Sequence, residues 1–158
     1  MTQEALLKLL ETDARLSDRQ IADRLGVSVS EVAAERATLE QEGRIVGYQT
    51  IVNHDEQGVA AFIEVRCTPE RGEGFDRLAQ RIARFDEVKS CYLMSGGYDL
   101  LVLVEGKNLK ELALFVSSKL SALEQVTGTQ TCFVLKRYKE DGIVFEGEKA
   151  DNRLVISP

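Results

Sequence analysis

The fold is decided by the stretch DRQIADRLGVSVSEVAAERATLEQEG, which occupies residues 18–43. Its apolar spacing predicts two short helices, and Gly26 between them can take the left-handed conformation that ends the first helix. Ser28, with a glutamate three residues later, has the spacing of a capping box and predicts the start of the second helix. Val32 and Leu39 fall on one side of that helix, where they can pack against the first. Two short helices joined by a glycine turn are typical of a helix-turn-helix, whose second helix enters the DNA major groove. The alternative is a helical corner without a role in DNA binding.

The residues around this stretch predict a third helix and an extended segment. Leucines dominate residues 3–12 and give that helix a broad apolar face. Ser17 with Gln20 repeats the capping-box spacing ahead of residue 18. Residues 45–52 are β-branched and too few for a core helix, which predicts a strand or an extended connector. We therefore expect a helix-turn-helix domain of winged-helix-like type over residues 1–53.

Residues 54–158 alternate between strand and helix periodicity. The expected elements are a strand at 59–67, a helix at 71–85, a strand at 88–94, a tight turn at 95–99, a strand at 100–104, a helix at 109–123 and a strand at 129–138. This order predicts an α+β domain, a ferredoxin-like βαββαβ sandwich with both helices on one face of the sheet. The other face stays uncovered, which predicts dimerisation through it. Two apolar runs in the tail, 142–145 and 154–156, are expected to lengthen the sheet or to cross to a partner subunit.

Composition indicates a soluble protein without a cofactor. The chain has 158 residues, of which 44% are hydrophobic and 29% charged. No stretch approaches the roughly 20 apolar residues of a membrane helix, and the first residues lack the features of a signal peptide. Cys67, Cys91 and Cys132 lie in apolar stretches without ligand spacing. We expect a cytoplasmic protein with buried reduced thiols and no metal site.

The charge is unusual for a protein that binds nucleic acid. The net charge is −6, and each predicted domain carries −3 of it. Neither half has the basic excess that typically guides a protein to DNA.

Five motifs follow one another along the chain in a characteristic order: Asp13-Ala-Arg-Leu-Ser17, Leu39-Glu-Gln-Glu-Gly-Arg-Ile-Val-Gly-Tyr48, Ser95-Gly-Gly-Tyr-Asp99-Leu-Leu, Thr127-Gly-Thr-Gln-Thr131 and Asp151-Asn-Arg-Leu-Val-Ile156. Together with the predicted order of elements, they resemble the Lrp/AsnC (feast/famine) family of transcriptional regulators over nearly the whole chain. The resemblance implies binding to double-stranded DNA upstream of amino-acid metabolism genes and a response to a free amino acid. It also implies homodimers built on the second domains, often assembled into rings of dimers.

The resemblance places the effector between second domains of neighbouring subunits, around the turn at Ser95. The residue types there suit an amino acid. Gly96 and Gly97 expose backbone N–H groups that can hold a carboxylate, as in a nest. Asp99 can accept hydrogen bonds from an ammonium group, and Tyr98 offers a ring and a hydroxyl. Thr129 and Thr131 share one face of a strand and complete the candidate set. The alternative is a glycine hairpin whose Asp99 only caps the turn.

The recognition helix departs from the family pattern, because Glu35-Arg36 stands where relatives usually carry an arginine followed by an apolar residue. The candidate DNA contacts are Arg19, Ser28, Ser30, Ala33, Arg36, Ala37 and Gln41. Such side chains contact base edges weakly, and few of them can neutralise phosphates. A ring of dimers would multiply weak contacts. For Arg36 the alternative is a side chain turned inward to pair with a carboxylate.

Two other classes of function share parts of this pattern. Sirohaem decarboxylases are distant relatives with the same two-domain plan. However, the chain has a single histidine, His54, and no readable catalytic constellation, so we do not expect an enzyme. A ligand-binding oligomeric interaction module with weakened DNA binding is the other alternative, and the acidic first domain motivates it.

Overall fold

The computed structural model describes residues 2–53, 58–69, 72 and 74–145. The chain divides into two compact units, Met1–Val52 and Asn53–Pro158. The predictions for His54 and for residues 151–156 lie outside the described residues. No helix in the described part is long and apolar enough to span a membrane.

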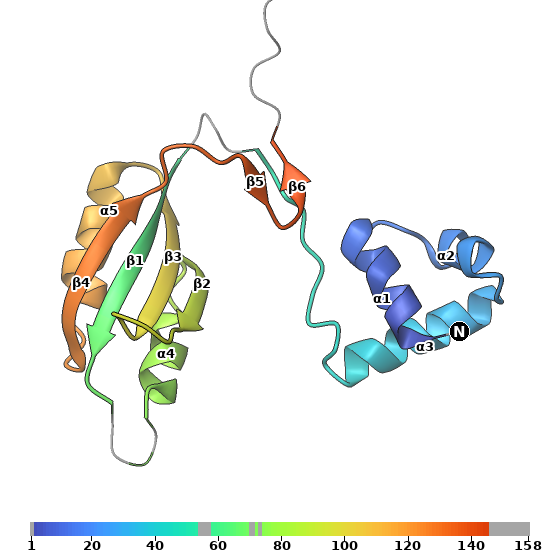
Figure 1. Ribbon diagram of the computed structural model, residues 1–158, viewed down its shortest axis with the longest axis horizontal. Coiled ribbons are helices and arrows are strands. Elements are labelled where there is room, and N and C mark those ends of the chain that lie inside the picture. The colour runs from blue at the N-terminus through green and yellow to red at the C-terminus, as the bar shows by residue number, and fades with distance from the viewer. Residues whose placement is uncertain (1, 54–57, 70–71, 73, 146–158) are drawn as a thin grey trace, which may run out of the picture. The chain divides into compact units, whose positions relative to one another are not determined.

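Unit 1 is a bundle of three helices (Figure 1): α1 Gln3–Thr12, α2 Asp18–Leu25 and α3 Val29–Gln41. Both predicted capping boxes are formed. The Ser28 hydroxyl accepts the Glu31 N–H at 3.2 Å, and the Glu31 carboxylate accepts the Ser28 N–H at 2.9 Å. That backbone hydrogen bond is the main cause of a lowered pKa at Glu31. Gly26 ends α2 with φ 67°, in the left-handed conformation expected.

The core of unit 1 comes from the predicted apolar faces. Its buried residues are Leu6, Leu10, Leu16, Ile21, Ala22, Val32 and Leu39. After α3, the backbone N–H groups of Arg44 and Ile45 both donate to the Leu39 carbonyl, at 2.9 and 3.0 Å. Residues 46–53 contain no strand. The extended connector is therefore the form observed, and the described part of unit 1 has no wing hairpin.

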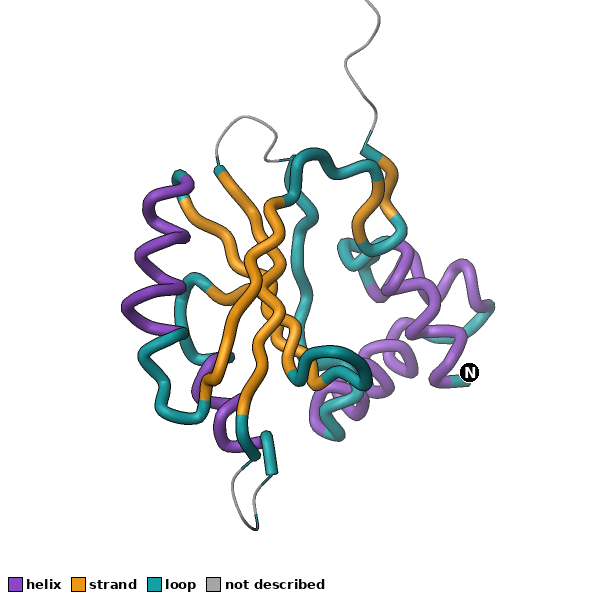
Figure 2. The backbone as a smooth tube through the Cα atoms, turned by 60° about the vertical axis from the view of Figure 1, so that its left-hand side comes forward, coloured by secondary structure: helices purple, strands orange, loops and turns teal. Residues whose placement is uncertain are grey.

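Unit 2 has the predicted ferredoxin-like order. Its main elements are β1 Val59–Cys67, α4 Asp76–Ile82, β2 Val88–Leu93, β3 Leu100–Gly106, α5 Leu109–Phe115, a π-helical turn η1 Val116–Leu120 and β4 Val126–Phe133. The strands form an antiparallel sheet in the order β2-β3-β1-β4. Both helices pack on one face of this sheet (Figure 2), over the inward side chains of β1 and β3.

Several element boundaries differ from the prediction. Strand β3 runs on to Gly106 rather than 104, and β4 begins at Val126 rather than 129. Helix α4 is shorter than 71–85, because Gly74, just before it, has φ 61°, which is not a helical conformation. The helix predicted at 109–123 ends in a π-helical turn at Leu120. Strand β4 ends at Phe133, which pairs with Ala61, rather than at residue 138; one further hydrogen bond, from the Val134 N–H to the Ala60 carbonyl, follows it.

The tail forms a separate hairpin of β5 Lys139–Glu140 and β6 Ile143–Val144. These strands pair only with each other, so the run at 142–145 does not lengthen the main sheet.

The face of the sheet opposite the helices carries apolar side chains. Phe62 on β1 pairs with Leu103 on β3 and Cys132 on β4, and Tyr92 on β2 pairs with Leu101. We call these five residues the open face. Phe62 is 38% exposed and Tyr92 is 53% exposed. The expectation of three buried thiols is therefore wrong for Cys132. An edge strand places that cysteine on the uncovered side, whereas Cys67 is buried and Cys91 half-buried.

Candidate DNA-binding and effector-binding sites

Helix α3 presents small polar and apolar side chains to solvent. Ser30, Ala33, Ala37 and Gln41 are all exposed, and their spacing puts them along one side of the helix. Arg19 is exposed on α2. The Ser28 side chain belongs to the capping box, where its hydroxyl also donates to the Glu31 carboxylate at 2.7 Å. Ser28 therefore sets the start of the recognition helix. The four exposed side chains of α3 form the surface that could face a DNA groove.

Arg36 points into unit 1 rather than outward. Its Nε donates to Asp18 Oδ1 at 2.8 Å, and its Nη2 donates to the Leu16 carbonyl at 3.1 Å. Its Nη1 donates to the Tyr48 hydroxyl at 3.3 Å, and that hydroxyl donates to Glu40 Oε1 at 2.8 Å. The Arg36 side chain is 18% exposed. Burial disfavours its charge, but the hydrogen bonds to Tyr48 and Asp18 outweigh burial and raise the pKa of Arg36. The structure thus shows the inward alternative, in which Arg36 pairs with a carboxylate of its own unit rather than pointing outward as a DNA contact would.

This network links three parts of unit 1. Arg36 ties α3 to the first residue of α2, and Tyr48 ties the connector after α3 back to the same helix. This role of Tyr48 was not predicted from the sequence, although Tyr48 closes the motif that begins at Leu39. With Arg36 held inside, the candidate DNA face depends on Arg19 and Arg24, which are exposed and form no ion pair with any other residue the structure describes.

In unit 2, the turn at Ser95–Asp99 connects β2 to β3. The Met94 N–H donates to the Asp99 carbonyl at 2.8 Å, which closes the turn. The Asp99 N–H donates to the Val65 carbonyl at 2.9 Å, and Asp99 Oδ2 accepts the Cys67 N–H at 2.8 Å. Asp99 thereby extends the pairing of β1 with β3 by one hydrogen bond. The Asp99 carboxylate also forms a side-chain hydrogen bond with the Cys67 thiol.

The fold does not require glycine at either position of this turn, Gly96 or Gly97. Neither Gly96 nor Gly97 has a positive φ, so the alternating conformation of a backbone nest is not present. A Cβ atom at either position would meet nothing within 4 Å. Both glycines are exposed, while Tyr98 and Asp99 are half-buried. The backbone of the turn is therefore open to solvent at both glycines.

Thr129 and Thr131 share one face of β4, as expected, and that face is the one covered by helices. Thr129 pairs with Val65 and Thr131 with Ile63, both fully buried core residues. Because Val65 also accepts the Asp99 N–H, Thr129 and Asp99 lie on opposite sides of one residue of β1. Nearby, burial raises the pKa of the Cys67 thiol to about 11, and the Asp99 carboxylate adds to the shift.

A helix-turn-helix unit followed by a ferredoxin-like sandwich defines a DNA-binding regulator with a separate ligand domain. Comparison with known proteins agrees with this class. Residues 3–40 match the AsnC-type helix-turn-helix domain, and residues 60–144 match the Lrp/AsnC ligand binding domain. The chain belongs to the Lrp/AsnC family of transcriptional regulators.

Two relatives cover most of the chain. The HTH-type transcriptional regulator YugG of Bacillus subtilis (strain 168), described as uncharacterized, is 45% identical over 157 residues, covering 97% of this chain and 95% of YugG. The proline dehydrogenase transcriptional activator of Rhizobium radiobacter is 29% identical and covers 87% of this chain and 90% of its own.

Solved structures share the fold. The leucine response regulatory protein LrpA of Mycobacterium tuberculosis is 26% identical with a TM-score of 0.75, covering 88% of this chain and 94% of that one. The regulator NMB0573 of Neisseria meningitidis, solved as an L-Met complex, is 24% identical with a TM-score of 0.73, covering 87% and 90% of the two chains.

Proposed function

We propose that this protein binds DNA through α3 and that a free amino acid, bound at the Ser95–Asp99 turn, controls that binding in the cytoplasm. The effector site lies between second domains of neighbouring subunits. The relatives reported above are regulators, which supports a role without catalysis. The observation that carries the effector proposal is the turn itself. It combines the exposed backbone of Gly96 and Gly97 with the half-buried Asp99 carboxylate.

The DNA-binding surface consists of Arg19, Ser30, Ala33, Ala37 and Gln41, with Ser28 fixing the start of the helix. Alanines and small polar groups can approach base edges closely, and Ala33 and Ala37 suit contact with thymine methyl groups. The side chains offer few phosphate contacts, so binding by one unit is weak and several units must act together.

Association of subunits follows from the open face. Phe62, Leu103 and Tyr92 form an apolar surface that two sandwiches can cover by packing face to face. A dimer formed this way carries two recognition helices, and its geometry sets the spacing of the DNA half-sites. A ring of such dimers creates the interface between neighbours where the turn is expected to meet its effector.

An amino acid that binds more tightly in one assembly shifts the equilibrium toward that assembly. The test is fluorescence anisotropy of the full chain on DNA from its own upstream region, against scrambled DNA, at low and near-physiological salt. Each titration is repeated with single amino acids, for the wild type and for Asp99→Asn. Asparagine can still accept the Cys67 N–H, so the turn is kept while the charge is lost.

We expect specific DNA binding in both proteins and an amino-acid response only in the wild type. Glu11→Gln, a neutralisation at an exposed position of α1 in unit 1 and outside the recognition helix, serves as the matched control and should keep the response. A response that survives in Asp99→Asn would show that the effector does not use this carboxylate. A failure to prefer the upstream DNA at either salt, with or without amino acids, would favour the interaction module.

A further inference from the structure

The connector after α3 is attached to that helix at two places. The first is the end of the helix, where the Arg44 and Ile45 N–H groups donate to a carbonyl of its last turn. The second is the side chain of Tyr48, which reaches back to α3. Between the two places, Val46 is 94% exposed, and Gly47 is exposed as well. The Tyr48 side chain is therefore what returns the connector to the helix.

Tyr48 contacts two charged side chains that lie one turn apart on α3. Its hydroxyl donates to Glu40 Oε1 at 2.8 Å and accepts a hydrogen bond from Arg36 Nη1 at 3.3 Å. The central carbon of the Arg36 guanidinium also lies 6.0 Å from the centre of the Tyr48 ring, at the limit of a cation–π contact. Hydrogen bonds to charged groups are stronger than those between neutral groups. We call Arg36, Glu40 and Tyr48 the clasp.

Arg36 gives the clasp one fixed side. Its other nitrogens donate within the helical bundle, to Asp18 Oδ1 at 2.8 Å and to the Leu16 carbonyl at 3.1 Å. The side chain is also largely buried. A guanidinium held in this way cannot follow Tyr48 when the connector moves. Movement of the connector away from α3 therefore opens the clasp and leaves Arg36 in place.

The clasp changes the length of connector that is available between the two units. When it is open, the connector is attached to the bundle at Ile45, which is half-buried against the core of unit 1. When it is closed, the attachment lies at Tyr48. Three residues span about 10 Å when extended, which equals about three base pairs of DNA at roughly 3.4 Å each. A closed clasp therefore shortens the reach of each recognition helix by that distance.

We propose that the clasp determines which spacings of DNA half-sites a dimer of this protein accepts. It does so by fixing the point at which the connector leaves each recognition unit. Tyr48 is thus a specificity-determining residue that acts through the position of α3, without touching DNA. The bases read within one half-site do not depend on it. The inference rests on the proposed function, because it takes α3 as the reading helix and the dimer as the species that binds.

The test compares four full-length proteins: wild type, Tyr48→Phe, Tyr48→Ala and Tyr138→Phe. Each selects duplexes from a pool of random-sequence DNA, and sequencing gives both the enriched half-site and the distribution of distances between paired half-sites. A second measurement uses no DNA. Mass spectrometry follows tryptic cleavage after Arg44, the bond beside the segment that the clasp holds. Circular dichroism melting checks the fold of each variant, and Tyr48→Phe carries the test if Tyr48→Ala melts early.

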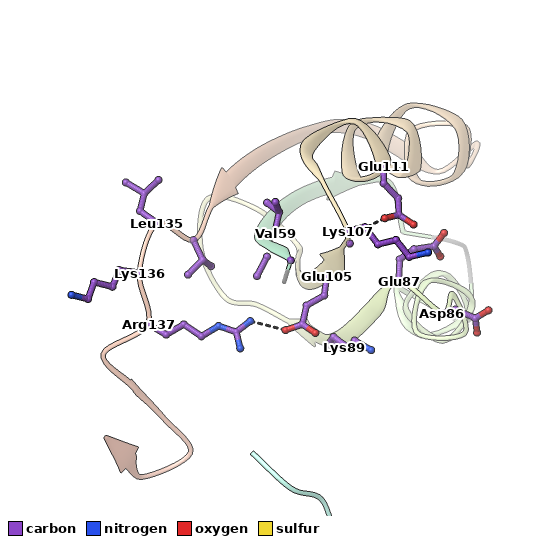
Figure 3. Close-up of a pocket in the computed structure, with 14 residues that line it drawn as sticks. Val59, Asp86, Glu87, Lys89, Glu105, Lys107, Glu111, Leu135, Lys136 and Arg137 are labelled. Atoms are coloured by element: carbon purple, nitrogen blue, oxygen red, sulfur yellow. Dashed lines mark hydrogen bonds and ion pairs between the residues drawn. The ribbon is translucent and has the colours of Figure 1, made fainter. Parts of the chain in front are cut away.

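Tyr138→Phe is the matched control, because it removes a tyrosine hydroxyl that forms no hydrogen bond within the part of the chain that the structure describes. Its ring contact with the Lys136 ammonium group, at 5.1 Å, is kept by phenylalanine. The segment around it is held to β3 by the ion pair of Arg137 with Glu105 at 2.6 Å (Figure 3). The control therefore loses a hydroxyl without loss of an attachment.

We expect all four proteins to enrich the same half-site. The wild type and Tyr138→Phe should enrich one dominant spacing, whereas Tyr48→Ala should accept spacings up to about three base pairs to either side of it. Tyr48→Phe keeps the ring over Arg36 and should fall between the two. Cleavage after Arg44 should be roughly tenfold faster in Tyr48→Ala and unchanged in Tyr138→Phe.

Two results overturn this inference while the proposed function stands. In the first, Arg44 is cleaved faster in both Tyr48 variants but the spacing distribution matches the wild type, so the clasp opens without effect on DNA. In the second, cleavage and spacing are the same in all four proteins, so Tyr48 does not hold the connector. A wild type that enriches no paired half-sites overturns the proposed function, and this inference with it.

Discussion

At the scale of single residues, a substitution of Arg36 is expected to weaken DNA binding indirectly, by destabilising unit 1, because all the hydrogen bonds of Arg36 lie within unit 1. Arg36→Gln leaves the partly buried Asp18 carboxylate without its ion pair, and the loss of a charged hydrogen bond costs about 1.5–3 kcal/mol. We expect a lower melting temperature and weaker DNA binding, with an unchanged slope of log affinity against log salt. Arg19→Gln is the matched comparison, since an exposed phosphate contact carries a slope of about 0.9 and little stability. Anisotropy at four salt concentrations and thermal denaturation separate the two. A flatter slope in Arg36→Gln with an unaltered melting temperature would place the side chain on DNA instead.

At the scale of elements, features set by residues close together in the sequence could be predicted, whereas features set by residues far apart in the sequence could not. The capping boxes at Ser17 and Ser28 and the helix end at Gly26 were readable because each involves residues no more than four apart. The end of β4 was not, since it depends on how far β4 pairs with β1, a strand about 70 residues earlier in the chain. The same holds at the candidate sites. Asp99 could be singled out as a turn carboxylate, but its bond to Cys67 joins residues 32 apart and leaves no local pattern.

The helix-turn-helix itself offers a test at this scale, through Gly26→Ala. Gly26 has φ 67°, and a Cβ there would meet nothing within 4 Å, so the substitution adds backbone strain without a clash. We expect a loss of about 1–2 kcal/mol and a melting temperature lower by several degrees. Gly47→Ala is the control, because that glycine has no left-handed φ and equal free space. Thermal melting followed by circular dichroism measures both. Equal melting temperatures for the two variants would mean that the turn at Gly26 readily takes another conformation.

At the scale of the whole molecule, the two sides of the sheet place their cysteines in opposite environments, one buried and one exposed. Cys67 lies on the helix-covered side, where burial first and the Asp99 carboxylate second raise its pKa to about 11. A raised thiol pKa means that the neutral form favours the fold. This contribution is present below the ordinary pKa of 9.0 and is lost as pH rises through about 11. At pH 8 only about a thousandth of Cys67 is thiolate, so alkylation there is slow at any protein concentration. Cys132, on the open face, is exposed in the single chain and becomes covered when two open faces meet.

Alkylation by iodoacetamide at pH 8, with the modified cysteine identified by mass spectrometry, therefore reports the association of subunits. We expect Cys132 to react slowly at high protein concentration and faster on dilution, while Cys67 stays slow throughout. Phe62→Glu places a charge opposite Cys132 on the open face, and should make Cys132 react fast at every concentration. Leu109→Glu introduces the same charge at an exposed position on α5, away from the open face, and should behave as the wild type. If dilution and Phe62→Glu both leave the Cys132 rate unchanged, the open face is free in solution. The spacing of the DNA half-sites would then have to be set by another contact between subunits.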